Sequence, residues 1–249
     1  MNLVIDVGNS RVKYGLFNKN HKLIFSDAVS PNLFEDKLQQ LFIFYPQIQN
    51  SIFSASGENS NRWISILKKK TNCTLFSHST SIPIQNKYKT PDTLGLDRIA
   101  LAVSSFFQYP NKNCLIVDLG TCITYDFLHK DGRYLGGAIS PGIEMRFKAM
   151  HNFTANLPFI KENTGLGETY IGKTTEESLK IGVYQAIIHE IEGFYKQYIA
   201  DYENLTLVLT GGSAQVLAER VKNSIFANLN FQLLGLHQIL IYNINANQK

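Results

Sequence analysis

Apolar runs and amphipathic segments follow one another along the chain in an order that occurs twice. In the first part, short apolar runs predict strands at 2–7, 11–17, 21–26, 51–54 and 73–76. Apolar residues at helical spacing predict helices at 32–44 and 61–70. A third helix is expected to open at Gly95-Leu96-Asp97-Arg98 and to end before Pro110.

The second part of the chain repeats this order. Apolar runs predict strands at 115–118, 123–128, 134–139 and 205–209. The longest helix is predicted from Glu176 to about Tyr198, Pro141 is placed to start a helix, and a further helix is predicted through Val221. Three strands, a helix, a strand and a helix in each part predict a mixed α/β fold with two halves, 1–110 and 111–249, and no linker between them.

A hairpin motif with a carboxylate and a glycine occurs once in each half. Asp6-x-Gly8-Asn9 and Asp118-x-Gly120-Thr121 each follow an apolar run and precede another. Either motif alone is typical of an ordinary hairpin turn. Two copies, together with the strand-ending turn Thr210-Gly211-Gly212, favour turns whose backbone N–H groups bind the phosphates of a nucleotide. Lys13 could reach a phosphate or be an exposed strand lysine.

The helix start at 95–98 carries a carboxylate beside a guanidinium. As a purely structural feature, Asp97 would be stabilised by the positive end of the helix dipole. As a functional feature, Asp97 would be a general base and Arg98 would grip a carboxylate through two hydrogen bonds. The nucleotide-binding turns make a phosphate-acceptor site here plausible.

A second phosphate-binding pattern is present but lacks its structural context. Residues 167–174 match the P-loop pattern G-x-x-x-x-G-K-[ST], which requires a buried strand leading into the loop. The preceding segment, 158–163, is polar and contains Pro158, and Tyr170 and Ile171 are bulky where the backbone should approach phosphate. We therefore expect this segment to help start the long helix.

Composition excludes several classes of protein. Of the 249 residues 44% are apolar and 18% charged, which is typical of a globular chain and not of a disordered one. The net charge of +4 is mild, and Lys68-Lys69-Lys70 is expected to be a solvated helix end, not a nucleic-acid site. Cys73, Cys114 and Cys122 lack metal-ligand spacing, so we expect reduced, structural thiols. The six histidines likewise show no metal-site spacing, and no stretch is apolar enough to span a bilayer.

Taken together, the motifs resemble those of type III pantothenate kinase in order and spacing over nearly the whole chain. The resemblance rests on Asp6-x-Gly8-Asn9-Ser10-x-x-Lys13, Gly95-x-Asp97-Arg98, Asp118-x-Gly120-Thr121-x-x-Thr124-x-Asp126, Gly136-Gly137-x-Ile139-x-Pro141-Gly142 and Thr210-Gly211-Gly212. It implies a duplicated ribonuclease H-like fold of the actin, sugar-kinase and heat-shock chaperone ATPase superfamily, with two mixed-sheet α/β halves facing a nucleotide cleft. It also implies ATP-dependent phosphorylation of pantothenate to 4'-phosphopantothenate, the first committed step toward coenzyme A.

The resemblance also implies partners, cofactors and individual roles. The expected enzyme is a cytoplasmic homodimer, with the long helix from Glu176 as a candidate interface, and it needs Mg²⁺ and either K⁺ or NH₄⁺. Asp97 would accept the proton of the pantothenate hydroxyl, Asp118 would hold the monovalent cation, and Asp6 would organise the Mg²⁺ shell through water. The implied pantothenate-binding residues are Tyr88, Gly95, Leu96, Asp97, Arg98 and Thr175, with Thr174 as the alternative to Thr175. The implied ATP-binding residues are Asp6, Val7, Gly8, Asn9, Ser10, Arg11, Val12, Lys13 and Thr121.

Two residues depart from the family pattern, and two other functions are compatible with the sequence. Ser10 stands where the family commonly has threonine, and Cys122 stands where a smaller residue is usual and could crowd the nucleotide turn. A regulatory relative without catalytic activity is one alternative, although Asp6, Asp97 and Asp118 argue against a pure binding protein. A kinase of another small hydroxy compound on the same fold is the other.

Overall fold

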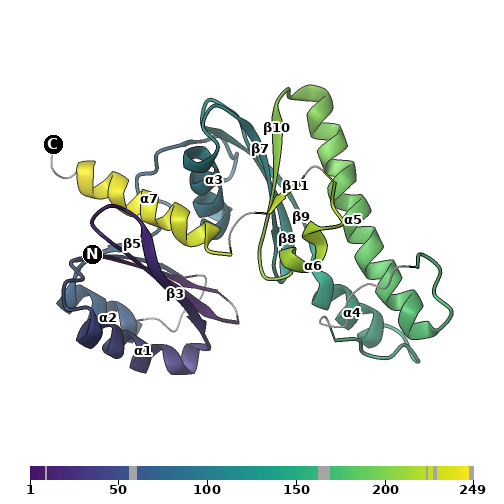
Figure 1. Cartoon of the computed structure of the whole chain (residues 1–249), viewed down its shortest axis with the longest axis horizontal. Coiled ribbons are helices and arrows are strands. Elements are labelled where there is room, and N and C mark those ends of the chain that lie inside the picture. Colours follow the sequence, from purple (N-terminus) through teal and green to yellow (C-terminus); the bar gives the residue numbers. More distant parts are fainter. Residues whose placement is uncertain (9, 56–60, 162–168, 223, 227–228, 247–249) are drawn as a thin grey trace. The chain divides into compact units, whose positions relative to one another are not determined.

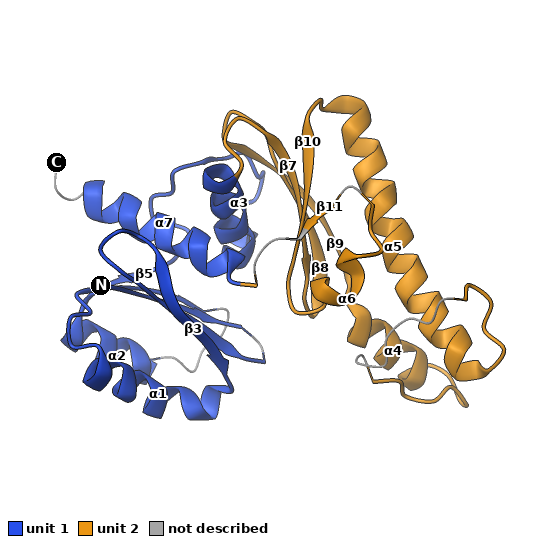
Figure 2. Ribbon diagram, viewed as in Figure 1, with its two compact units in different colours: residues 1–108, 230–249 blue, residues 109–229 orange. Residues whose placement is uncertain are grey.

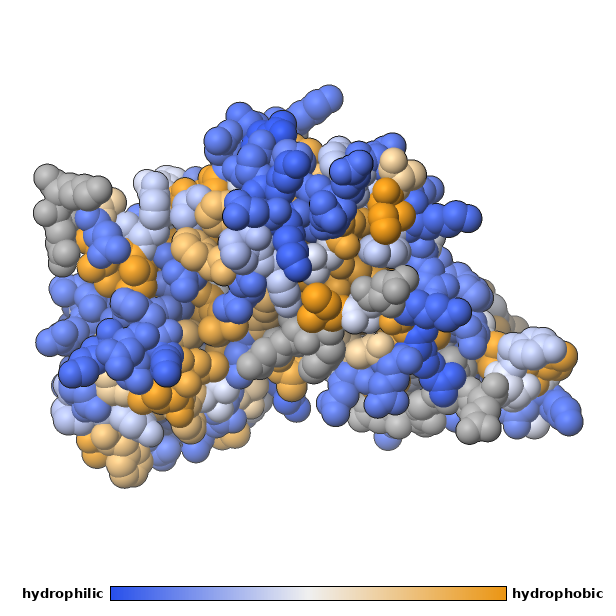
Figure 3. All heavy atoms as spheres, turned by 45° about the horizontal axis from the view of Figure 1, so that its top comes forward, coloured by the Kyte–Doolittle hydropathy of each residue, from blue (hydrophilic) through white to orange (hydrophobic). Residues whose placement is uncertain are grey.

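The computed structural model describes residues 1–8, 10–55, 61–161, 169–222, 224–226 and 229–246. The chain divides into two compact units, residues 1–108 with 230–249 and residues 109–229 (Figures 1 and 2). Hydrophilic residues cover most of the face seen in Figure 3, interrupted by hydrophobic patches. Among the described residues, no helix is both long and apolar enough to cross a membrane.

Unit 1 is built on a mixed sheet whose strands lie in the order β3-β2-β1-β4-β5. The antiparallel meander β1 (Asn2–Val7), β2 (Val12–Phe17) and β3 (Leu23–Val29) is followed by β4 (Asn50–Ala55) and β5 (Asn72–Leu75), which run parallel to β1. The helices α1 (Pro31–Phe44) and α2 (Asn61–Lys70) pack on one face through Phe34, Leu38 and Leu67. The two-residue strand β6 (Gln85–Asn86) and the 3₁₀ turn η1 (Pro91–Thr93) precede α3 (Leu96–Gln108).

The last helix, α7 (Phe231–Ala246), belongs to unit 1 although residues 109–229 separate it from that unit in sequence. It packs on β1, β2, β4 and α3. Glycine is required at position 235 because a Cβ there would collide with the carbonyl group of Ala100 on α3. The predicted halves, 1–110 and 111–249, assign this helix to the second half, whereas in the structure it completes the first.

A buried histidine lies where α7 meets the sheet. The ring of His237 is fully buried and stacks on Phe17, with 3.9 Å between the ring centroids. Asn2 Nδ2 donates a hydrogen bond to His237 Nε2 at 3.2 Å. Burial, with a smaller contribution from nearby His21, lowers the pKa of His237 to about 3. The imidazole is therefore a neutral part of the core.

Unit 2 repeats the strand order of unit 1. The meander β7 (Asn113–Leu119), β8 (Cys122–Leu128) and β9 (Arg133–Pro141) is followed by β10 (Leu205–Thr210) and β11 (Ser224–Phe226). Within the unit these strands lie in the order β9-β8-β7-β10-β11, with β10 parallel to β7 and β11 parallel to β10. The duplication predicted from the two hairpin motifs is confirmed by this shared topology.

Among the described residues, unit 2 contains three helices. These are α4 (Ile143–Asn152), the long α5 (Thr175–Asp201) and the short α6 (Ala214–Ala218). Residues from α4, α5 and α6 share one apolar core with β7, β8 and β10. The helix predicted through Val221 ends at Ala218, and Pro141 ends β9 whereas α4 begins at Ile143.

The three cysteines are free, but they do not share one environment. Cys114 is buried in β7, and burial raises the pKa of its thiol to about 12. Cys73 is half-buried. Cys122, expected to be a structural thiol like the other two, is exposed at the first position of β8.

Candidate active site

The hairpin between β1 and β2 places a buried carboxylate beside an exposed turn. Asp6 is 8% exposed and lies directly opposite Lys13 across the antiparallel pair, so both side chains point to the same face of the sheet. The turn is closed by Gly8 N, which donates to the carbonyl oxygen of Arg11 at 3.0 Å. Ser10 and Arg11 are exposed, and Asn9 lies outside the described residues. Arg11 in this turn and Lys13 on the adjoining strand β2 place two basic side chains next to exposed residues, which suits a phosphate site.

The start of α3 presents a carboxylate and a guanidinium in different environments. Asp97 is exposed, and its Oδ1 accepts a hydrogen bond from the backbone N–H of Arg98 at 2.9 Å. A Cβ at Gly95 would collide with this same Oδ1, so the carboxylate occupies space that a side chain at position 95 would fill.

Arg98 is only 4% exposed, in contrast to Asp97. Its guanidinium carbon lies over the ring of Tyr88, 5.8 Å from the ring centroid. The structure thus brings together three of the sequence-predicted substrate residues, Tyr88, Asp97 and Arg98, within unit 1. Leu96 is the first residue of α3 and is half-buried.

In unit 2, three glycine-containing turns meet at the end of β7. Asp118 is half-buried and is paired in register with Thr124 on β8 and Thr210 on β10. Gly211 has φ = +96°, and a Cβ at this position would collide with Asp118 Oδ1. Asp118 therefore lies directly against the Thr210-Gly211 turn.

Backbone hydrogen bonds connect the same turns. Gly120 N donates to Cys122 O, Gly142 N donates to Thr121 O, and Ser213 N donates to Leu119 O, each at 3.1 Å. A Cβ at Gly142 would collide with the backbone of Gly120 and Thr121. Thr121 remains exposed at this meeting point, with the Cys122 side chain exposed next to it. Only residues without a side chain allow the three turns to approach this closely, which is the packing expected of a phosphate-binding cradle.

A buried carboxylate lies behind Asp118, and sequence reasoning gave it no role. Asp126 is fully buried in β8 and accepts hydrogen bonds from Thr124 Oγ1 at 2.8 Å and from Tyr134 OH at 2.6 Å. Because Thr124 is the cross-strand partner of Asp118, this network fixes the hydroxyl beside Asp118. A charged residue inside the apolar run 123–128 is the signal that could have identified it.

The two threonine candidates before α5 differ in what they contact. Thr174 is the N-cap of α5, and its Oγ1 accepts from Glu177 N at 3.2 Å. Lys173 N donates to Glu177 Oε2 at 2.7 Å, which completes the helix start. Thr175 is exposed. The cap occupies Thr174, which leaves Thr175 as the candidate for contact with substrate.

The described part of the P-loop pattern, residues 169–174, leads into the same helix start. Residues 167 and 168 lie outside the described residues, and the described part of the segment ahead of them, 158–161, forms no strand. Gly172 packs against Ser178 in the first turns of α5. The described part of this segment is thus the approach to a capped helix.

Within the described residues, no group of three or more His, Cys, Asp or Glu side chains could hold a metal ion. A divalent ion bound by one carboxylate and by substrate phosphates does not need such a group. Asp6 and Asp118 are carboxylates of this kind, and each lies at the end of the first strand of an antiparallel meander.

The comparisons with known proteins agree on one family. The family model for type III pantothenate kinase matches residues 2–197. The type III pantothenate kinase of Christiangramia forsetii is 44% identical over 245 residues, covering 98% of this chain and 99% of the relative. That of Flavobacterium johnsoniae is 38% identical over the same length, with the same coverage.

Solved structures support the fold. The activator of the 2-hydroxyisocaproyl-CoA dehydratase from Clostridium difficile, solved with bound ADPNP, superimposes with a TM-score of 0.59 at 13% identity, covering 99% of this chain and 96% of that one. The ROK hexokinase from Thermus thermophilus gives a TM-score of 0.54 at 13% identity, covering 98% and 99%. The predicted fold class, a duplicated ribonuclease H-like fold of the actin and sugar-kinase type, is confirmed.

Proposed function

This chain belongs to the type III pantothenate kinase family, and we propose from that premise which of its residues carry out the reaction. The reaction is the ATP-dependent phosphorylation of pantothenate in coenzyme A biosynthesis. Its acceptor is a hydroxy acid, which needs a base for the hydroxyl and a cation for the carboxylate. The observation that carries our assignment is the start of α3, where exposed Asp97 stands next to Arg98 held against Tyr88.

Asp97 is the proposed proton acceptor of the pantothenate hydroxyl. Its exposed carboxylate accepts a hydrogen bond from the Arg98 backbone N–H, in space left open by the missing side chain at Gly95. Arg98 is the proposed partner of the pantothenate carboxylate, because a buried guanidinium forms strong paired hydrogen bonds with a carboxylate. The other proposed pantothenate-binding residues are Tyr88, Gly95, Leu96 and Thr175. Phosphoryl transfer needs little covalent help from the protein, so positioning and charge neutralisation supply most of the rate.

ATP is the phosphoryl donor, and the turns of this chain fit its phosphates. We assign phosphate binding to the turn of unit 1, where Lys13 supplies positive charge, and contact with ATP to Thr121 in unit 2. The close-packed glycines 142 and 211 support this assignment. The proposed ATP-binding residues of the turn are Asp6, Val7, Gly8, Asn9, Ser10, Arg11, Val12 and Lys13.

The kinase family uses a divalent metal ion with ATP. When bound, Mg²⁺ neutralises charge on the phosphates. Asp6 is the proposed holder of its water shell, and the buried position of this carboxylate at a strand end fits that role.

Three finer properties are also proposals. Asp118 would hold K⁺ or NH₄⁺, supported by its half-buried position among the turns of unit 2. The enzyme would be a cytoplasmic homodimer with α5 at the interface, supported by the resemblance to the family. Light scattering of the purified chain would test the dimer, because a monomer at micromolar concentration contradicts it. Fractionation of cells that express the tagged chain would test the location.

A coupled assay of ADP release tests the proposed function directly. We expect ATP-dependent turnover with pantothenate and little with a panel of sugars and other hydroxy acids. A regulatory relative without activity would bind ATP and show no turnover with any acceptor. A kinase of another compound would prefer a different member of the panel.

A further inference from the structure

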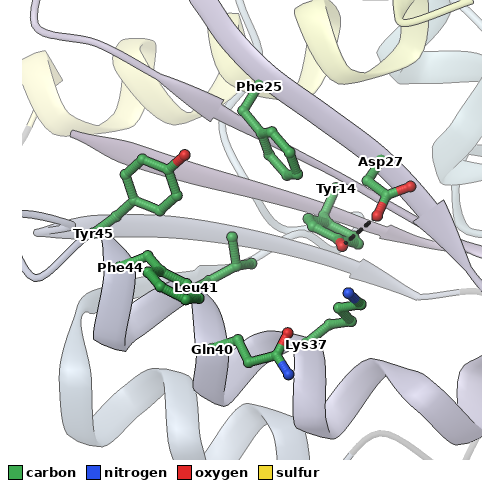
Figure 4. A pocket seen from close by; sticks show the side chains of 8 residues that line it. All are labelled: Tyr14, Phe25, Asp27, Lys37, Gln40, Leu41, Phe44 and Tyr45. Carbon is green, nitrogen blue, oxygen red and sulfur yellow. Dashed lines mark hydrogen bonds between the residues drawn. The ribbon is translucent and has the colours of Figure 1, made fainter.

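Unit 1 contains a cavity on the face of its sheet opposite to Asp6 and Lys13. The cavity has a volume of about 410 Å³ and lies between α1 and the outer strands β2 and β3 (Figure 4). Tyr14, which lines it, belongs to the core formed with α1 and α2. Neighbouring strand residues point to opposite faces, so Lys13 and its cross-strand partner Asp6 face away from this cavity. The cavity is thus separate from the turn assigned to ATP.

One end of the cavity is apolar and aromatic. Phe25 lies on β3, and Leu41, Phe44 and Tyr45 come from the last turn of α1 and the residue after it. The ring centroids of Phe25 and Tyr45 are 6.5 Å apart. Phe44 is 72% exposed, so its ring is accessible to a ligand at this end of the cavity.

The other end of the cavity carries one negative and one positive side chain. Tyr14 OH donates to Asp27 Oδ2 at 2.9 Å, and Asp27 lies directly opposite Tyr14 across the β2–β3 pair. Figure 4 shows the amino group of Lys37 pointing toward this pair, from the helix on the other side of the cavity. Within the described part of the chain, the Lys37 ammonium forms no ion pair with Asp27 or another carboxylate.

At the other end of the cavity, hydrogen bonds fix the orientation of the Asp27 carboxylate. Burial and the hydrogen bond to Asp27 raise the pKa of Tyr14, so its hydroxyl stays neutral and donates to the carboxylate. The second carboxylate oxygen, Oδ1, accepts from the backbone N–H of Ala28 at 2.8 Å. Asp27 is thereby held in one orientation while remaining exposed to an incoming group.

We propose that this cavity binds a small zwitterion with a flat hydrocarbon group, of the class of the free aromatic amino acids. The ligand's ammonium pairs with Asp27 and its carboxylate pairs with Lys37, while its ring packs among Phe25, Phe44 and Tyr45. A ligand with only one charge would meet repulsion from one of the two side chains without gaining both attractions. The cavity volume lies in the range of small-molecule sites.

Isothermal titration of the full chain with L-phenylalanine tests the proposal. A ligand of this size is expected to bind at one site with a Kd on the order of 1 mM. Three probes each remove one part of it: phenethylamine lacks the carboxylate, 3-phenylpropanoate lacks the ammonium, and L-alanine lacks the ring. Each should bind at least about tenfold more weakly, the loss expected for one charge-assisted contact or one buried ring.

Two variants and their matched controls complete the test. Lys37→Met and Asp27→Asn should each raise the Kd for L-phenylalanine about tenfold or more. Lys68→Met on α2 and Asp36→Asn on the exposed side of α1 remove the same charges elsewhere in unit 1 and should leave it unchanged. Melting temperatures show whether each variant is folded. The proposal is overturned if L-phenylalanine shows no saturable binding up to about 50 mM, if the pocket variants bind like their controls, or if a probe with one charge binds equally well.

Discussion

Replacing Arg98 by methionine removes the guanidinium that we assign to the pantothenate carboxylate. Because Arg98 is only 4% exposed, water does little to screen its pairing with a substrate anion. Truncating one partner of such a pair costs about 3 kcal/mol, which corresponds to roughly a hundredfold or more in kcat/KM. Arg98→Met also removes the contact with Tyr88, a loss of about 1 kcal/mol that affects folding more than substrate discrimination.

Comparing two substrates separates these effects. Pantothenol carries an alcohol in place of the carboxylate, so it cannot use the guanidinium in the proposed way. We expect kcat/KM for pantothenate to fall roughly a hundredfold in Arg98→Met while that for pantothenol changes less than about tenfold. Arg98→Lys keeps the charge without the planar fork and should be intermediate. Equal losses for both substrates, in a variant whose melting temperature is preserved, would show that Arg98 does not contact the carboxylate.

Four further changes test other parts of the structure. Asp97→Asn should lower kcat by about a hundredfold or more and leave calorimetric ATP binding intact, with Asp92→Asn as the exposed control in the preceding turn; an active Asp97→Asn enzyme would remove the proposed base. Asp118→Ala should abolish the increase in turnover that occurs when potassium replaces sodium in the assay. An unchanged increase would refute the proposal that Asp118 holds the monovalent cation. Gly235→Ala forces α7 away from the Ala100 carbonyl group and should lower the free energy of unfolding in urea by about 2 kcal/mol; a change below about 0.5 kcal/mol would mean that the two helices separate freely. His237 has a lowered pKa, so the unfolded chain binds the extra proton below about pH 6.5 and stability falls as the pH decreases from there toward 3. Through this residue the free energy of unfolding should fall by about 2 kcal/mol between pH 7.5 and pH 5. A His237→Gln variant whose free energy of unfolding falls equally over this range would contradict the role given to His237.

The strands and most helices could be predicted because their apolar pattern has a clear period. The helix predicted at 61–70 matches α2, and that predicted at 32–44 differs from α1 by one residue. The helix α7 was not predicted because its own buried residues lie on several of its sides: Phe231, Gln232 and Leu233 are consecutive and all buried. A helix covered on several sides has no amphipathic period to detect.

The parts of the candidate site were predictable to different degrees. Asp6, Asp97 and Asp118 could be singled out because each stands at the junction of an apolar segment and a glycine turn. The close contact of Asp118 with the Gly211 turn depends on how β7 and β10 pair, which local sequence does not encode. The Thr124–Asp126–Tyr134 network and the cavity under α1 also arise only when separate strands are brought together.

The return of α7 to the first unit constrains how the chain can fold during synthesis. The face of the first sheet that α7 covers stays open until residues 231–246 have been synthesised, so unit 1 cannot finish folding before unit 2 has been made. Ribosome-bound chains stalled after residue 229 should accordingly be protease-sensitive in their first 108 residues, whereas full-length released protein should resist digestion. A nascent chain already resistant at that length would mean that the amino-terminal sheet is stable without its final helix.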